Sequence, residues 1–157
     1  YGSGHAFENN IFLANADIVF VYGDNNIFKN NIIAGSAAGG NRYIEGLSNQ
    51  FYNNIFQNDP HLGTNPIYED NFYPVNIATV FVNLPDYPFN YDYDYHLQAP
   101  ETYPGTDGSQ IGIYGGNYPY KEGAVPSNPH IYMKNIAAQT DNQGQLQIQI
   151  GVEAQTH

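Results

Sequence analysis

Short apolar runs separated by polar turns recur along the first half of the chain. Residues 7–12, 28–33 and 51–56 share one pattern, in which Phe is followed by one polar or aromatic residue, two asparagines and an apolar pair. The asparagine pairs begin at positions 9, 30 and 53, so the repeat advances by 21 and then by 23 residues. A period near 22 residues built from short strands predicts a β-solenoid.

The paired asparagines have a structural explanation in such a solenoid. Asn tolerates positive φ better than most other non-Gly residues, so it suits a tight turn between two strands. Stacked coils lie about 4.8 Å apart, and equivalent amides can then hydrogen-bond along a ladder. We therefore expect a structural ladder, and a fourth, weaker copy of the repeat at residues 75–77. The predicted ladder residues are Asn9, Asn10, Asn30, Asn31, Asn53 and Asn54.

Two later segments extend the pattern. Residues 93–97 have the sequence Tyr-Asp-Tyr-His-Leu, and residues 105–116 have the sequence GTDGSQIGIYGG. With the Asn-Asn repeats, they resemble the C-terminal coils of secreted bacterial proteins of the right-handed parallel β-helix, pectate-lyase-like superfamily. The resemblance covers residues 1–116 and implies an all-β, right-handed parallel β-helix of about 22–23 residues per coil, closed by a final coil. It departs from the family pattern at residues 98–104, where the usual Ser-Pro-Ala-Ile link is missing.

The end of the chain has a different composition. Residues 117–130 contain three X-Pro steps and are interpreted as an extended linker. Residues 145–152 alternate between polar and apolar side chains after a turn signal at 141–144. Residues 131–157 are therefore expected to form a β-hairpin or the start of a further β-domain. Its apolar face would need to dock on the solenoid or on further sequence.

Composition excludes several classes of function. The chain has 15 acidic and 4 basic residues, a net charge of −11, so we expect neither nucleic-acid binding nor attraction to an anionic membrane. No apolar stretch approaches the length of a membrane span, about 18 residues. The absence of cysteine excludes disulfides and cysteine metal sites. With 21 Asn, 16 Gly and 10 Pro, almost no α-helix is expected.

One cluster of titratable residues suggests metal or acid–base chemistry. Asp92, Asp94 and His96 alternate with tyrosines, so a strand would place them on one face. Such a face could hold Ca²⁺ or act as an acid–base pair. The interpretation we favour is that the tyrosines pack while the carboxylates face solvent or cap turns. We therefore expect no metal or other cofactor, with Asp92 and Asp94 as the secondary candidates for Ca²⁺.

A second cluster suggests carbohydrate binding. Arg42, Tyr43 and Glu45 combine a base, an aromatic ring and an acid within one coil, which could hold a sugar by stacking and hydrogen bonding. The favoured alternative is an exterior salt bridge. The lyases of the resembled superfamily use a Lys or Arg base on a central coil, and this chain offers few. No catalytic residue is assigned.

These observations lead to one functional hypothesis and two alternatives. The chain is expected to be the C-terminal, non-catalytic part of a secreted β-helix protein that binds or degrades polysaccharide, its parent being a polysaccharide lyase or glycoside hydrolase. The first alternative is a structural or adhesive cell-surface solenoid without enzyme activity. The last is a catalytic fragment using Asp92, Asp94 or Arg42. Expected partners are polysaccharide and upstream coils of the same protein or another chain. The expected location is secreted or on the surface of a Gram-negative bacterium.

Overall fold

The chain folds into two units whose regular secondary structure is almost all β-strand. The computed structural model describes residues 2–14, 19–20, 23–35, 43–122 and 128–154. The chain divides into residues Tyr1–Pro119 and Tyr120–His157, and each unit is described by itself. Over the described ranges the helical residues all lie in short 3₁₀ segments and none is in an α-helix, which agrees with the sequence composition.

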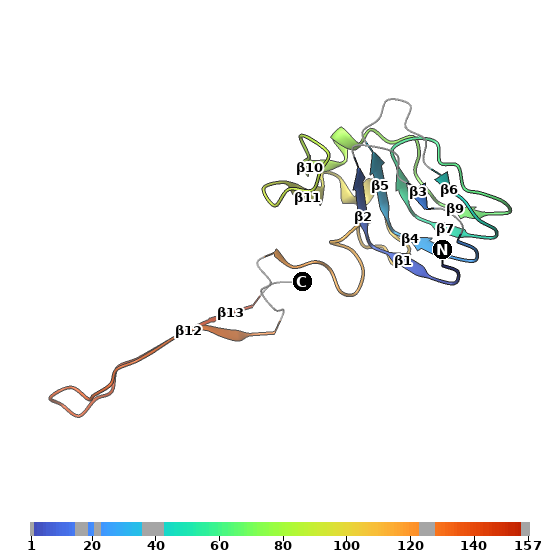
Figure 1. Ribbon diagram of the computed structural model, residues 1–157. Coiled ribbons are helices and arrows are strands. Elements are labelled where there is room, and N and C mark those ends of the chain that lie inside the picture. The colour runs from blue at the N-terminus through green and yellow to red at the C-terminus, as the bar shows by residue number, and fades with distance from the viewer. Residues whose placement is uncertain (1, 15–18, 21–22, 36–42, 123–127, 155–157) are drawn as a thin grey trace. The chain divides into compact units, whose positions relative to one another are not determined.

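Parallel sheets form the body of the first unit. The strands β1 (Ala6–Glu8), β4 (Ile27–Lys29), β7 (Gln50–Tyr52) and β9 (Ile67–Glu69) pair in that order (Figure 1). A second parallel sheet contains β2 (Ile11–Ala14), β5 (Ile32–Gly35) and β8 (Ile55–Phe56), and a third contains β3 (Val19–Phe20) and β6 (Tyr43–Ile44). In the described residues the first two coils therefore add one strand to all three sheets, the third coil adds β7 and β8, and the fourth adds β9, as in a β-helix-like solenoid.

The predicted all-β parallel solenoid is thus confirmed, although its fourth coil lies elsewhere than expected. Tyr68 pairs with Phe51, and Asn71 bonds to Asn54 across a step of 17 residues. The expected copy at residues 75–77 was wrong, because that segment leads into the 3₁₀ helix η1 (Ile77–Thr79). The coil is short because residues 57–66 return directly from β8 to β9. Right-handed winding, the usual sense for parallel crossovers, stays a prediction.

Stacked aromatic rings fill the interior of the coils. Phe7 stacks on Phe28 with ring centroids 4.9 Å apart, and Phe28 stacks on Phe51 at 5.0 Å. Ile33 and Phe56 belong to the same buried cluster. The rings repeat because parallel, in-register strands place equivalent side chains directly above one another.

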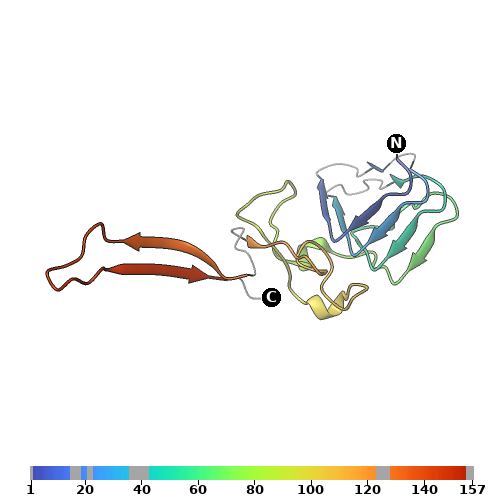
Figure 2. The ribbon, with the colours of Figure 1, turned by 90° about the horizontal axis from the view of Figure 1, so that it is seen from below.

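In the second sheet, β5 and β8 are buried on both faces, whereas β2 is half-buried. Ile33 and Phe56 face the coil interior, whereas their neighbours Ile32 and Ile55 belong to a separate core on the outer face. Residues after the fourth coil cover that outer face. They include the antiparallel pair β10 (Phe81–Asn83) and β11 (Asp94–Leu97), followed by the 3₁₀ helix η2 (Pro100–Thr102). Figure 2 shows the stacked parallel strands from a second direction.

Residues 104–116, called the strap below, run along the coils rather than adding another one. Asn53 donates to the carbonyl of Pro104, the amide of Thr106 donates to Asn30, and Gly116 lies close to Asn9. The strap therefore passes from the third coil to the first. The segment expected to close the helix as a final coil instead covers the side of the existing coils.

The second unit is an antiparallel hairpin, as predicted. Its strands are β12 (His130–Ile136) and β13 (Ile148–Glu153), joined through a turn in which Asp141 accepts from the amides of Gln143 and Gln145. The sequence alternation gives one face rich in Ile and Val, and these side chains are exposed. Residues 123–127 of the predicted linker lie outside the described residues.

Candidate functional site

The outward face of the four-stranded sheet carries a row of polar and aromatic side chains. Because inward Phe and Tyr residues alternate with outward neighbours, Glu8, Lys29, Tyr52 and Glu69 occupy equivalent outward positions on successive strands. The Nζ of Lys29 lies 3.1 Å from the Oε1 of Glu8, and the Tyr52 hydroxyl donates to Gln50 Oε1 over 2.9 Å. We call these four side chains the outer row.

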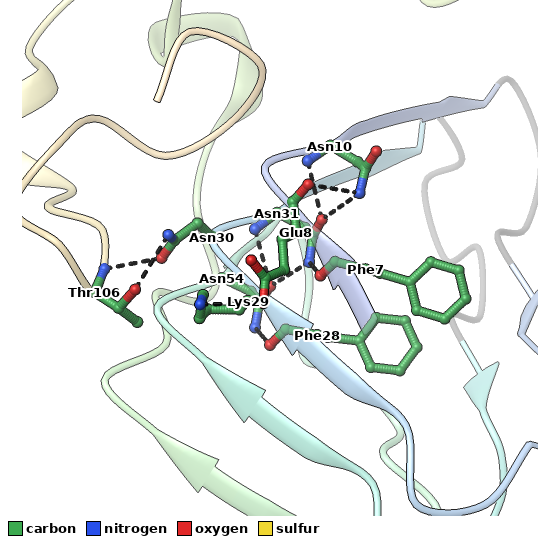
Figure 3. A network of polar contacts seen from close by, with 9 residues as sticks. All are labelled: Phe7, Glu8, Asn10, Phe28, Lys29, Asn30, Asn31, Asn54 and Thr106. Carbon is green, nitrogen blue, oxygen red and sulfur yellow. Dashed lines mark hydrogen bonds and ion pairs between the residues drawn. The ribbon is translucent and has the colours of Figure 1, made fainter. Parts of the chain in front are cut away.

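The inner asparagine of each pair forms the predicted ladder (Figure 3). Asn31 Oδ1 accepts from both the amide and the Nδ2 of Asn10, each over 3.0 Å. Asn54 Oδ1 accepts in the same way from Asn31, and Asn71 Oδ1 accepts from Asn54. Asn31 and Asn54 are fully buried, so their amides are occupied by the fold and offer nothing to a ligand.

The outer asparagine of each pair has a different role. Asn9, Asn30 and Asn53 adopt φ values of 56°, 56° and 50°, which is the left-handed turn conformation expected from the sequence. The side chains of Asn30 and Asn53 bond to the strap. For example, the backbone amide of Thr106 in the strap donates to Asn30 Oδ1 over 2.9 Å (Figure 3). These asparagines therefore attach the strap and do not extend the ladder.

A second set of buried asparagines was missed by the sequence analysis. Asn26 Oδ1 accepts from the amide of His5 over 2.9 Å, and Asn49 Oδ1 accepts from the amide of Asn26 over 2.8 Å. Each is buried and stands two residues before the Phe of its repeat. The sequence does carry a signal for this set, because Asn26 and Asn49 occupy the same position of the repeat. That position is Asn in only these two copies.

The candidate carbohydrate cluster is only partly described. Arg42 lies outside the described residues. Tyr43 lies in β6, where its backbone pairs with Val19, and Glu45 is exposed just after that strand. The grouping of the three side chains therefore stays a prediction.

The Asp–His cluster differs from the expected strand face. β11 begins at Asp94, so Asp92 lies in the preceding turn, where its amide donates to Asn90 Oδ1. Asp94 Oδ1 accepts from the amide of His96 and lies 2.7 Å from its Nδ1, and these hydrogen bonds lower the pKa of Asp94. The His96 ring stacks on Tyr114 of the strap with centroids 3.7 Å apart.

These contacts give Asp94 and His96 a structural role. The Asp94 carboxylate orients His96, and His96 supports the strap through Tyr114. In the described part of the chain, no group of three His, Cys, Asp or Glu side chains is placed to hold a metal ion. None of the described helices is long and apolar enough to cross a membrane.

Comparison with known proteins adds no identification. No protein-family model, curated protein or solved structure matches this chain.

Proposed function

We propose that this chain is the non-catalytic, C-terminal part of a secreted β-helix protein, related to the pectate-lyase-like superfamily, that binds polysaccharide on the outer row. The supporting observation is the in-register line of Glu8, Lys29, Tyr52 and Glu69 across four parallel strands. Adjacent strands lie about 4.8 Å apart, so the line is an extended polar surface rather than a closed pocket. An extended surface suits a polymer better than a small metabolite.

The chemistry of the outer row suits sugar hydroxyls. Glu8 and Glu69 are exposed acceptors, Lys29 is a half-exposed donor, and the Tyr52 ring supplies an aromatic surface between them. Carboxylates and ammonium groups hydrogen-bond hydroxyls, while an aromatic ring can pack against the C–H face of a sugar. The row thus combines both kinds of contact.

Charge favours a neutral polysaccharide. Residues 1–119 contain 12 Asp and Glu but only two Lys and Arg, a net charge of −10. Such a surface repels polyanions, including the acidic polysaccharides that lyases cleave. We therefore infer a neutral glycan, and a parent protein located outside the cell or on the surface of a Gram-negative bacterium.

Two features of the outer row support a non-catalytic role. Glu8 and Glu69 lie on the first and fourth strands, which strand spacing places about 14 Å apart. Glycoside hydrolysis by paired carboxylates requires roughly 5 to 9.5 Å. Lys29 is the basic side chain in the outer row. Its ammonium group is paired with the Glu8 carboxylate, which stabilises the protonated form and opposes a role as a proton acceptor.

A structural or adhesive solenoid is the second candidate, and the asparagine ladder favours it. The most regular polar groups of the repeat, those of Asn31 and Asn54, bond to other coils and are buried. A repeat with a purely structural role would likewise use its regular polar groups to join neighbouring coils, and its outer row would bind no ligand.

Binding measurements on the 157-residue chain separate the two candidates. We expect a neutral glycan from a panel of neutral and acidic polysaccharides to bind, and Tyr52→Ala to weaken that binding at least tenfold, about 1.4 kcal/mol. Tyr91→Ala is the matched control, because Tyr91 is 88% exposed and lies outside the row. Arg42→Ala tests the other predicted cluster in the same assay. Absence of binding to the whole panel would favour the structural solenoid.

A further inference from the structure

We propose that the first coil is the docking edge for a further coil of the same Asn-Asn repeat, added parallel to β1 and β2. Both strands are terminal in their sheets, whose orders are β1-β4-β7-β9 and β2-β5-β8. A terminal strand presents backbone donors and acceptors along its open side, which is a template for another strand. Two further features of the first coil identify what fits there.

The first feature is the end of the asparagine ladder. Asn31 Oδ1 accepts from the amide and Nδ2 of Asn10, and Asn54 Oδ1 accepts from the same two groups of Asn31. Each Oδ1 thus points to the preceding coil. Asn10 Oδ1 accepts no hydrogen bond from the described residues, while its Nδ2 donates to Glu8 O and Asn31 Oδ1. An added Asn at the equivalent position would supply both missing donors.

The second feature is an apolar hollow beside β2. Ile11 and Leu13 of β2 line it together with Phe89, Tyr95 and Ile113, and this open hollow has a volume of about 230 Å³. In the next coil, Ile32 and Ala34 pair with Ile11 and Leu13 and are fully buried beneath the outer cover. Ile11 and Leu13 are only half-buried. The cover therefore has room for one more strand beside β2.

The lining of the hollow argues against other occupants. All five lining residues are apolar or aromatic, so a hydroxylated sugar would find few groups to orient it there. A second copy of the chain would bring another net charge of −11 against the first, which opposes close approach. A further coil in a single register would pair with the open edges of β1 and β2, donate to Asn10 Oδ1 and fill the hollow with apolar side chains. This inference does not depend on polysaccharide binding.

The test duplicates residues 2–22 directly before Gly2 in the otherwise complete chain, replacing Tyr1. The added coil carries its own equivalents of Asn10, Ile11 and Leu13 in the natural register. We expect amide hydrogen exchange in residues 6–14 of the original first coil to slow at least tenfold, and the methyl resonances of Ile11, Leu13 and Ile113 to shift. Protection in β4 and β5 reports that the solenoid itself is intact.

The matched control carries the same extension with its copies of positions 10, 11 and 13 changed by Asn→Asp, Ile→Ser and Leu→Ser. It should leave exchange in residues 6–14 unchanged. As a second measurement, a free peptide of residues 2–22 should shift the same methyl resonances of the unmodified chain, whereas a scrambled peptide should not. The proposal is overturned if neither form of the added coil has an effect, or if the control protects equally. It is also overturned if the unmodified chain self-associates and thereby protects these amides.

Discussion

Asn54 donates from Nδ2 to Asn71 Oδ1 over 2.8 Å, although the two residues are separated by only 17 positions. The preceding steps of the ladder are 21 and 23 residues long. The ladder therefore keeps its spatial register while the loops of each coil change length. This makes the inner asparagines, rather than the length of the repeat, the feature that aligns the coils.

Replacing an inner asparagine by aspartate should be strongly destabilising at neutral pH. In Asn54→Asp, the oxygen that replaces Nδ2 would face two acceptors, Phe28 O and Asn71 Oδ1, in a fully buried position. An uncompensated buried charge costs about 3–5 kcal/mol. Urea unfolding at pH 7, compared with the unsubstituted chain, measures the loss.

The same variant should show a defined pH dependence. Burial and the two facing acceptors raise the pKa of the introduced carboxyl in the folded state above its unfolded value of about 3.9. The penalty is therefore absent below the unfolded pKa and complete above the folded pKa, so stability should recover on acidification relative to the parent. Asn10→Asp, at the half-buried end of the ladder, is the control and should lose less. Equal losses in both variants would contradict this account.

The fourth coil offers a stabilising substitution. Tyr68 occupies the position of Phe51, and its hydroxyl is buried without a hydrogen-bond partner in the described structure. Burial, with Tyr73 and Asp59 nearby, raises the pKa of Tyr68. Tyr68→Phe removes a polar group that lost its hydration on folding, so the free energy of unfolding should rise by about 1 kcal/mol. Chemical denaturation measures the change.

Tyr52→Phe is the matched control for that substitution. Tyr52 follows Phe51 on the neighbouring strand, and its hydroxyl donates to Gln50 Oε1 over 2.9 Å. Removing this bonded, half-exposed hydroxyl should leave stability unchanged or slightly lower. A gain in Tyr52→Phe as large as that in Tyr68→Phe would show that the buried hydroxyl is not the cause.

Tyr68 also shows how far the sequence could predict this fold. Three copies of Phe-x-Asn-Asn were enough to predict a parallel solenoid with an asparagine ladder, because equivalent residues in stacked coils must repeat in type. The fourth copy was misplaced because Tyr68 and Asp70 replace Phe and Asn, and because the coil is shorter. Asp70 still takes a positive φ of 51°, so the substitution preserves the turn. A search that allowed Tyr in place of Phe and Asp in place of the outer Asn would have located the fourth coil better than a search for a constant repeat length.

The strap marks the limit of sequence reasoning for this chain. Thr106 bonds to Asn30 across 76 residues, and no periodic pattern relates the two positions. The resemblance predicted that residues 105–116 form a final coil, and nothing in their pattern indicated that they would instead cover existing coils. The outer row was also missed, because its members Glu8, Lys29, Tyr52 and Glu69 do not repeat one residue type from coil to coil. Only strand register brings them into line.

The turn within the strap should contribute to acid sensitivity. Ser109 donates to Asp107 Oδ1 from Oγ over 2.6 Å and from its amide over 3.0 Å, and these bonds lower the pKa of Asp107. The stabilisation is therefore present above the unfolded pKa of about 3.9 and is lost as pH falls through the lower folded value. Asp107→Asn should reduce the difference in stability between pH 7 and pH 2.5, measured by urea unfolding.

Ser109→Ala provides the matched test of the cause. It removes the Oγ donor but retains the carboxyl of Asp107, so the pKa of Asp107 should move toward its ordinary value. The pH dependence should then fall in the same direction as in Asp107→Asn. An unchanged pH dependence in both variants would mean that this turn does not respond to acid as its hydrogen bonds indicate.

Close packing of the strap on the coils should make one of its glycines sensitive to any side chain. Gly112 has a φ of 92°, and a Cβ there would lie 3.0 Å from Ile32 Cδ1 and 3.4 Å from Ile11 Cγ1. Gly108 has a similar φ of 79°, but a Cβ there would meet nothing within 4 Å. Both alanine substitutions carry backbone strain of about 1–2 kcal/mol, and Gly112→Ala adds a steric clash. Gly112→Ala should therefore lower the denaturation midpoint more than Gly108→Ala and accelerate amide exchange in residues 104–116. Equal effects of the two substitutions would show that the strap does not pack closely against β2 and β5.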